Sequence, residues 1–205
     1  MDITAEIQRY VSKHAGTIRG FDMVAGTSPN VLSPELVIAT RKVSSRISNA
    51  ELEWFVDKGS SAPWDAVGLD EGFADADVLE VHGLYDRATN LWNYFAVDSP
   101  RGIADAKISK VLFLMRPNTF PIIDSRLTKR YRPKARELWS SVYQKRPELR
   151  GSDLLTWEAF RRDLLKNQER LDATRGELTK GNELEVWVGK NASDLRLLDM
   201  IAWQE

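Results

Sequence analysis

Apolar side chains recur every three to four residues over most of this 205-residue chain, which is the spacing of α-helices buried on one face. The strongest stripe lies in residues 84–96, at Leu84, Ala88, Leu91, Trp92 and Phe95. Residues 184–188 alternate instead, as a short strand would. The sequence therefore predicts an all-α fold, mainly helical, with one possible short strand at 184–188.

The other helices are predicted from similar stripes and from residues that start a helix. Ser33 precedes a proline, Ser48 stands three residues before Glu51 in a capping box, and Ser152 and Ser193 can cap two later helices. The predicted ranges are 2–14, 33–43, 48–56, 105–115, 125–131, 135–143, 152–165 and 193–201. Residues 15–32 and the acid-rich residues 59–82 are predicted as loops, and 1–205 as a single domain with its core at 84–146.

Composition excludes several kinds of site. The chain has no cysteine and only two histidines, so thiolate zinc sites, iron–sulfur clusters and His-rich metal centres are excluded. No apolar run approaches the roughly 20 residues that span a bilayer, and the N-terminus lacks an apolar signal core. We expect a cytoplasmic monomer without a cofactor, a metal or a membrane partner, in which His14 and His82 are structural.

Positive charge is concentrated in one segment. Residues 101–150 carry 13 Lys and Arg against four Asp and Glu, whereas residues 1–100 carry eight against 15. Such a block predicts a surface for phosphates, nucleic acid or an acidic partner. The alternative is a pair of helices whose charges only face water. The acidic residues between 70 and 77 lack the spacing of a calcium loop and are interpreted as a solvated loop.

The segment SPRGIADAKISKVLFLMRPNTFPIIDSRLTKRY, residues 99–131, resembles the centre of a helix-hairpin-helix DNA glycosylase. The hairpin, residues 100–107, has Gly102-Ile103-Ala104 where this superfamily has Gly-hydrophobic-Gly. A second helix and the approach FPII follow, and Asp124 stands 22 positions after Gly102. The whole sequence, including the closing SDLRLLDMIAW, also resembles a bacterial family of unassigned function.

The resemblance implies a function for each part of this segment. Hairpin backbone N–H groups would approach a phosphate of double-stranded DNA, and Lys107 and Lys110 would add mobile charge. The residues that would follow the DNA backbone further along are Arg126, Lys129 and Arg130. Asp124 would stabilise positive charge on the sugar of a flipped nucleotide and orient water. From sequence alone, Asp124 can equally be only a helix N-cap.

Two departures from the superfamily pattern narrow the expected activity. Ala104 replaces the second glycine, and Ala106 stands where bifunctional members have their lysine nucleophile. Lys107 is one position later, about 100° around the helix. The resemblance therefore implies a monofunctional, water-using glycosylase for a damaged or modified base, in repair or in defence against phage DNA. Trp92 and Tyr94 are candidates for the wall of the base pocket.

Two alternatives remain open at this point. The first is a non-catalytic DNA-binding module that keeps the same fold. The second is an interaction protein whose basic face meets an acidic partner.

Overall fold

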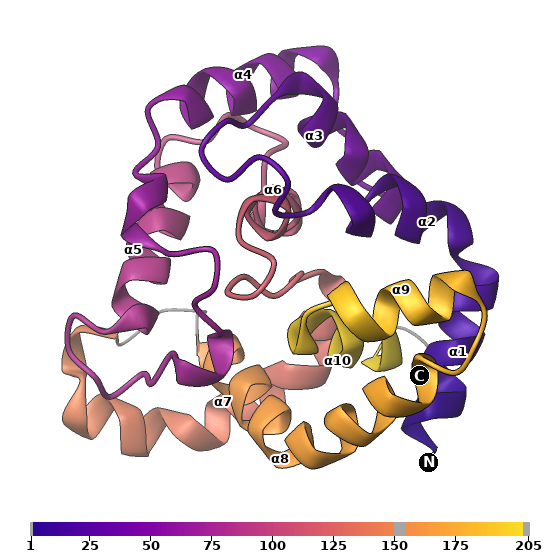
Figure 1. The fold of residues 1–205 in the computed structure, drawn as a ribbon. Coiled ribbons are helices and arrows are strands. Elements are labelled where there is room, and N and C mark those ends of the chain that lie inside the picture. Colours follow the sequence, from indigo (N-terminus) through magenta and orange to yellow (C-terminus); the bar gives the residue numbers. More distant parts are fainter. Residues whose placement is uncertain (1, 150–154, 203–205) are drawn as a thin grey trace.

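A computed structural model describes residues 2–149 and 155–202 of the chain. Within these residues it contains ten α-helices, five short 3₁₀-helices and no strand, and the protein is 70% helical (Figure 1). The predicted all-α fold class is therefore confirmed.

The α-helices are α1 (Ile3–Lys13), α2 (Ala15–Gly20), α3 (Pro34–Ala39), α4 (Asn49–Ser60), α5 (Leu84–Ala96), α6 (Asp105–Met115), α7 (Ser125–Lys145), α8 (Leu155–Leu178), α9 (Glu183–Asn191) and α10 (Asp194–Ala202). The 3₁₀-helices are η1 (Asp22–Val24), η2 (Thr40–Val43), η3 (Trp64–Ala66), η4 (Phe73–Asp75) and η5 (Pro147–Leu149). The first and last α-helices, α1 and α10, lie side by side (Figure 1).

Helix α6 lies in the middle of the molecule (Figure 1). Every residue from Ile108 to Met115 is buried, so this helix is covered on all sides rather than on one face. Helix α5 packs against it, and the stripe predicted for residues 84–96 is buried as expected. Trp157 of α8 continues the core, with its ring edge-on to those of Trp92 and Phe120.

The predicted helix starts are present wherever the structure describes them. Ser33 Oγ accepts a hydrogen bond from the Leu36 N–H at 3.4 Å, and Ser48 and Glu51 form the complete capping box. Ser193 Oγ accepts from the Arg196 N–H at 3.2 Å at the start of α10. Ser152 lies outside the described residues.

The predicted strand at 184–188 is wrong, because these residues belong to helix α9. Asn182 caps this helix by accepting from the N–H groups of Leu184 and Glu185 at 3.0 and 3.1 Å. A short apolar run has no periodicity long enough to separate strand from helix, and no partner strand exists among residues 2–149 and 155–202.

Several other segments are more helical than predicted, including the part of α8 beyond residue 165 and the short helices η3 and η4 within the predicted loop 59–82. Residues 125–131 and 135–143 form one continuous helix, α7, with Pro133 inside it. Leu127, Tyr131 and Ala135 are buried at intervals of four, so packing of this face outweighs the hydrogen bond that Pro133 cannot donate. Residues 15–32 are not only loop, since α2 and η1 form there around the buried Ile18.

Candidate functional site

Asp124 ends a buried segment and begins helix α7. Its Oδ1 accepts hydrogen bonds from the N–H groups of Arg126 and Leu127 at 2.9 and 3.0 Å, so it is the N-cap. The preceding residue, Ile123, donates its N–H to Ser109 of α6 at 3.1 Å, and both residues are buried. Asp124 is therefore held at a fixed point between α6 and α7.

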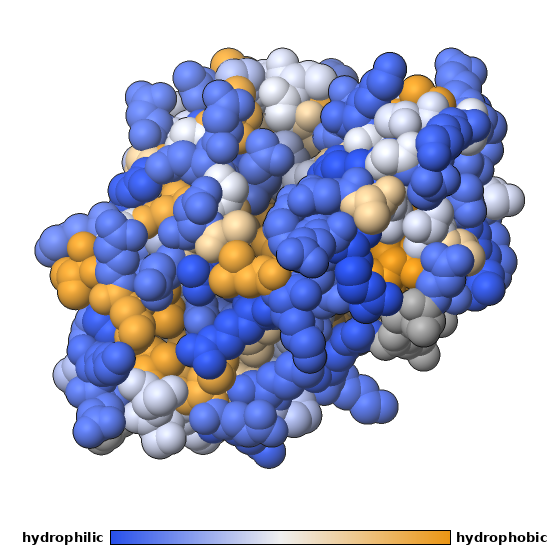
Figure 2. Space-filling model, turned by 60° about the horizontal axis from the view of Figure 1, so that its bottom comes forward, coloured by the Kyte–Doolittle hydropathy of each residue, from blue (hydrophilic) through white to orange (hydrophobic). Residues whose placement is uncertain are grey.

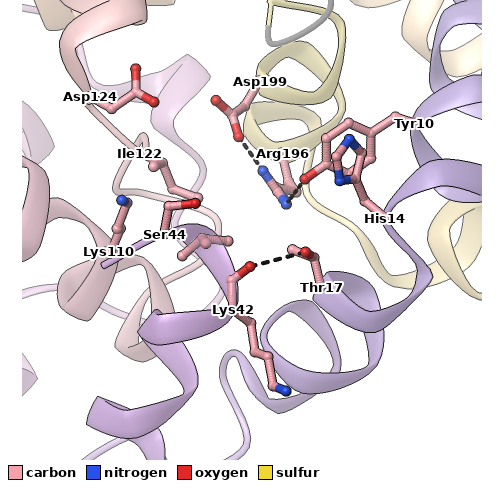
Figure 3. A pocket seen from close by; sticks show the side chains of 11 residues that line it. Tyr10, His14, Thr17, Lys42, Ser44, Lys110, Ile122, Asp124, Arg196 and Asp199 are labelled. Carbon is pink, nitrogen blue, oxygen red and sulfur yellow. Dashed lines mark hydrogen bonds and ion pairs between the residues drawn. The ribbon is translucent and has the colours of Figure 1, made fainter. Parts of the chain in front are cut away.

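The Asp124 side chain lines a narrow recess of about 80 Å³ (Figure 3). This volume is below the roughly 300–1,000 Å³ of pockets for drug-sized ligands, and it has room for a few water molecules. Helices α1, α2, η2, α6 and α10 contribute the rest of its lining, which comprises Tyr10, His14, Thr17, Lys42, Val43, Ser44, Lys110, Ile122, Arg196 and Asp199. Ser44 adopts a left-handed conformation (φ 60°), which is uncommon for a residue other than glycine.

The wall opposite Asp124 is a buried cluster around Arg196. Its guanidinium donates to both carboxylate oxygens of Asp22, at 2.6 and 3.2 Å, and to the Tyr10 hydroxyl at 2.8 Å. It also donates to Oδ2 of Asp199. Asp22, Arg196 and Asp199 each have side chains only 2% exposed, so two buried carboxylates share one cation.

Lys110 belongs to this recess and not to the surface on which it was expected. It is 7% exposed, and it makes no hydrogen bond or ion pair with the described part of the chain. Figure 3 shows it on the same side of the recess as Asp124. Its position is a consequence of α6 being buried all round, so that a lysine on this helix can avoid the core only by facing a cavity.

Burial shifts the protonation of several groups in the recess. It raises the pKa of Asp199 to about 6, and the nearby negative charge of Asp124 acts in the same direction, against Arg196. Burial lowers the pKa of Lys110, an effect that the charges of Asp124 and Asp199 oppose. Burial and the positive charge of Arg196 lower the pKa of His14, which favours its neutral form at pH 7.

The aromatic surface of the recess differs from the one predicted. Tyr10 and His14 line it, with ring centroids 4.5 Å apart. Trp92 is packed in the core with its ring 5.2 Å from that of Trp157, and Tyr94 bonds to Ser61 at 2.9 Å near α4. Neither predicted pocket-wall residue lines the recess.

The hairpin between α5 and α6 contains one glycine with a positive φ. Gly102 has φ 104°, whereas Ala104 is extended (φ −125°), so alanine at the second glycine position causes no backbone strain. Ile103 is 5% exposed and anchors the hairpin in the core. Lys107 donates to Glu51 Oε1 at 2.6 Å, and the same oxygen lies 2.8 Å from the point where a Cβ at Gly102 would stand. Glu51 thus covers the hairpin.

The basic block of residues 101–150 divides into buried and exposed groups. Arg116 and Arg146 are buried and donate to backbone carbonyls, Arg116 to Val67 at 2.5 Å and Arg146 to Val78 at 2.8 Å. The exposed basic residues of α7 are Arg126, Lys129, Arg132, Lys134, Arg136 and Lys145, and Arg130 is half-buried. Figure 2 shows the side of the molecule that includes α7 and α8, and its surface is largely hydrophilic.

Residues 2–149 and 155–202 contain no cluster of three or more His, Asp or Glu side chains arranged to hold a metal ion. No helix in these ranges is both long enough and apolar enough to span a bilayer.

Comparison with known proteins gives one match. A family model described as a family of unknown function, DUF6308, matches residues 3–205. The chain belongs to the DUF6308 family. No curated protein and no solved structure matches it. The resemblance to helix-hairpin-helix glycosylases therefore rests on residues 99–131 alone, and for a DUF6308 member the site must be argued from its own geometry.

Sequence reasoning brought Asp124 and Lys110 to one segment but missed the opposite wall of the recess. His14, Arg196 and Asp199 lie 110, 72 and 75 positions from Asp124 in the sequence, so no local spacing connects them. One sequence feature did indicate the part of the recess wall that α10 contributes. Arg196 and Asp199 are charged residues, three positions apart, inside the apolar stretch LRLLDMIA, and such charges are buried only when paired.

Proposed function

We propose that this protein binds double-stranded DNA and hydrolyses the N-glycosidic bond of a damaged or modified base, with water as the nucleophile and Asp124 as the key carboxylate. The observation that carries the proposal is the position of Asp124. It caps a helix with a basic exposed face, and it also lines the recess. A flipped nucleotide needs both a backbone contact and a pocket beside it, so the recess has to widen when a base enters.

The recess supplies the groups that the reaction requires. Asp124 stabilises the cationic character that develops on the sugar as the base departs, and it accepts the proton of the attacking water. The two hydrogen bonds to its Oδ1 fix the orientation of the carboxyl group. The rings of Tyr10 and His14 offer a surface against which a flipped base stacks.

DNA contact is assigned to the start and the exposed face of α7 rather than to the hairpin lysines. Arg126, Lys129 and Arg130 follow Asp124 within two turns of α7, and the first two are exposed. Lys107 is neutralised by Glu51, and Lys110 is buried. Hairpin N–H groups remain a candidate phosphate contact only if Glu51 moves away from Gly102.

The position of Glu51 over the hairpin also supports the two alternative functions predicted from the basic segment 101–150. If the hairpin does not meet a phosphate, the basic face of α7 can serve a non-catalytic DNA-binding module or an interaction with an acidic protein. The first alternative predicts salt-sensitive DNA binding without base release, and the second predicts no DNA binding at all.

The proposal is tested by incubating the protein with duplex oligonucleotides that carry a panel of modified bases. Released base is measured by mass spectrometry, and strands are analysed before and after hot alkali. The proposal predicts free base and an intact strand that alkali cleaves at the abasic site. Strand cleavage with a borohydride-trapped adduct on Lys110 or Lys42, the two lysines that line the recess, would contradict the monofunctional assignment.

A further inference from the structure

Asp199 carries an unsatisfied oxygen inside the recess wall. Its Oδ2 accepts from Arg196, but Oδ1 is buried and has no hydrogen-bond partner within residues 2–149 and 155–202. An ionised carboxylate oxygen without a donor is costly to bury, whereas a protonated carboxyl needs only an acceptor for its O–H. Asp199 lines the recess, so a molecule bound there can supply that acceptor once the side chain turns toward it, because Oδ1 itself is enclosed.

The charges around Asp199 favour this protonated form. One guanidinium, that of Arg196, serves both Asp22 and Asp199, and Asp124 adds a third carboxylate on the far side of the recess. The ionisable groups that face Asp199 are Tyr10 and His14 from α1, Asp22 from η1, Lys110 from α6, Asp124 before α7 and Arg196 from α10. Burial and the charge of Asp124 both raise the pKa of Asp199, to about 6, while Arg196 lowers it.

Two carboxyl groups in one recess thus lie in different environments. Asp124 accepts two backbone N–H hydrogen bonds at a partly exposed helix start, whereas Asp199 is fully enclosed. Carboxyl pairs whose environments separate their pKa values divide the work of an acid and a base.

We propose that Asp199 is the proton donor to the departing base, so that the protein releases bases that are neutral when bound in addition to bases that are already cationic. This proposal rests on the proposed glycosylase function. The Asp199 O–H proton passes to a nitrogen of the base as the C1′–N bond breaks, and that bond's electron pair goes to the base. Water adds to C1′ and gives its proton to Asp124. Asp124 then releases this proton to solvent and solvent returns a proton to Asp199, which leaves the protein unchanged.

The class of substrate follows from the leaving group. A neutral base leaves as an anion unless it is protonated, so it needs an acid in the recess. An N7-alkylated guanine is already cationic and leaves as a neutral molecule without any donor. Loss of Asp199 should therefore affect neutral bases and spare alkylated ones.

The test compares Asp199→Asn with wild type on two duplexes, one carrying the neutral base that the panel finds released and one carrying 7-methylguanine. Asparagine keeps the shape and can direct its amide oxygen to Arg196, but it has no proton to give. We expect release of the neutral base to fall by at least about 100-fold. We expect release of 7-methylguanine to stay within about threefold of wild type.

Asp124→Asn is the matched control, since it should slow release from both duplexes. If Asp199→Asn slows both equally, or neither, Asp199 is not the donor. If only alkylated bases are released by wild type, the proposal is wrong while the glycosylase function stands. If no base is released from any duplex, both the Asp199 proposal and the proposed glycosylase function are wrong.

A second variant and a direct titration keep the proposal testable if Asp199→Asn does not fold. Asp22→Asn removes a negative charge that raises the pKa of Asp199. The pH at which neutral-base release declines should then move below its wild-type value near 6. Carbon-13 NMR of the Asp199 carboxyl should show titration near pH 6 in the free protein. A midpoint near 4, the ordinary value for aspartate, would overturn the proposal without any activity measurement.

Discussion

The Lys107 ammonium lies 2.6 Å from the Glu51 carboxylate, so the lysine nearest the hairpin is ion-paired with α4. Glu51 is at the same time the third helical residue of the capping box that starts α4, where it accepts from the Ser48 N–H at 2.8 Å. One carboxylate therefore links the start of α4, the hairpin and the start of α6. The ion pair holds the hairpin against α4, and the charge of Lys107 is not available for a phosphate.

Replacing Gly102 by alanine should destabilise the protein. The φ of 104° is a conformation that L-residues rarely adopt, and a Cβ would lie 2.8 Å from Glu51 Oε1. We expect a loss of about 1–3 kcal/mol in the free energy of unfolding, measured by urea denaturation. Gly176→Ala is the control, because it lies inside α8 with open space around it and should gain about 0.5–1 kcal/mol. Equal stability of Gly102→Ala and wild type would show that the hairpin adopts another conformation.

Salt dependence should identify the basic residues that meet DNA. Each phosphate contact contributes close to one unit to the slope of log affinity against log salt. Lys129→Ala should flatten this slope by about 1, because the Lys129 side chain is exposed on α7. Lys107→Ala should leave the slope unchanged, because its charge is already neutralised by Glu51. The reverse result would place the hairpin, and not α7, on the DNA.

Sequence patterns predicted the parts of the fold in which each residue's environment is set locally. The stripe at 84–96, the Ser48–Glu51 capping box and the N-cap at Asp124 all depend on neighbours within four residues, and all are present. Helix α9 and the continuity of α7 through Pro133 were missed because packing from α8 decides them. Packing across the fold can override local propensity in this way.

The candidate site likewise contains residues that local sequence predicts and residues that only the folded structure brings together. Asp124 was found from its distance to Gly102 in the sequence, but the cluster of Asp22, Arg196 and Asp199 joins residues more than 170 positions apart. Lys110 was assigned to the surface because a lysine is seldom buried, and only the central position of α6 reverses that expectation.

The architecture itself is tested at Leu91, which is fully buried between α5 and the rest of the core. Leu91→Ala removes three side-chain carbons from this packing and should cost about 2–5 kcal/mol in the free energy of unfolding. Val97→Ala, at a residue that is 59% exposed, should cost less than about 0.5 kcal/mol. Both are measured by urea denaturation. A loss below about 1 kcal/mol for Leu91→Ala would mean that α5 does not pack as described.

Stability should depend on pH through Asp199. Its pKa is about 6 in the folded protein and about 3.9 in an unfolded chain, so the folded state binds this proton more tightly. The contribution of Asp199 is therefore fully present below about pH 4 and is lost as pH rises to about 6 and above. Relative to Asp199→Asn, wild type should lose up to about 3 kcal/mol across this window.

Urea denaturation of both proteins at pH 4, 5, 6 and 7 measures this difference, and every other titrating group cancels to first order. A difference that is constant with pH would show that Asp199 titrates normally in the folded protein.

Asp124→Asn tests the central claim most directly. Asparagine also caps helices well, so the variant should unfold at the same urea concentration as wild type and bind the same duplex with the same affinity. A neutral amide cannot stabilise cationic sugar character, and we expect single-turnover base release to fall by about 100-fold or more. Release at the wild-type rate by a folded, DNA-binding Asp124→Asn protein would contradict the account, because the recess would then act without its carboxylate.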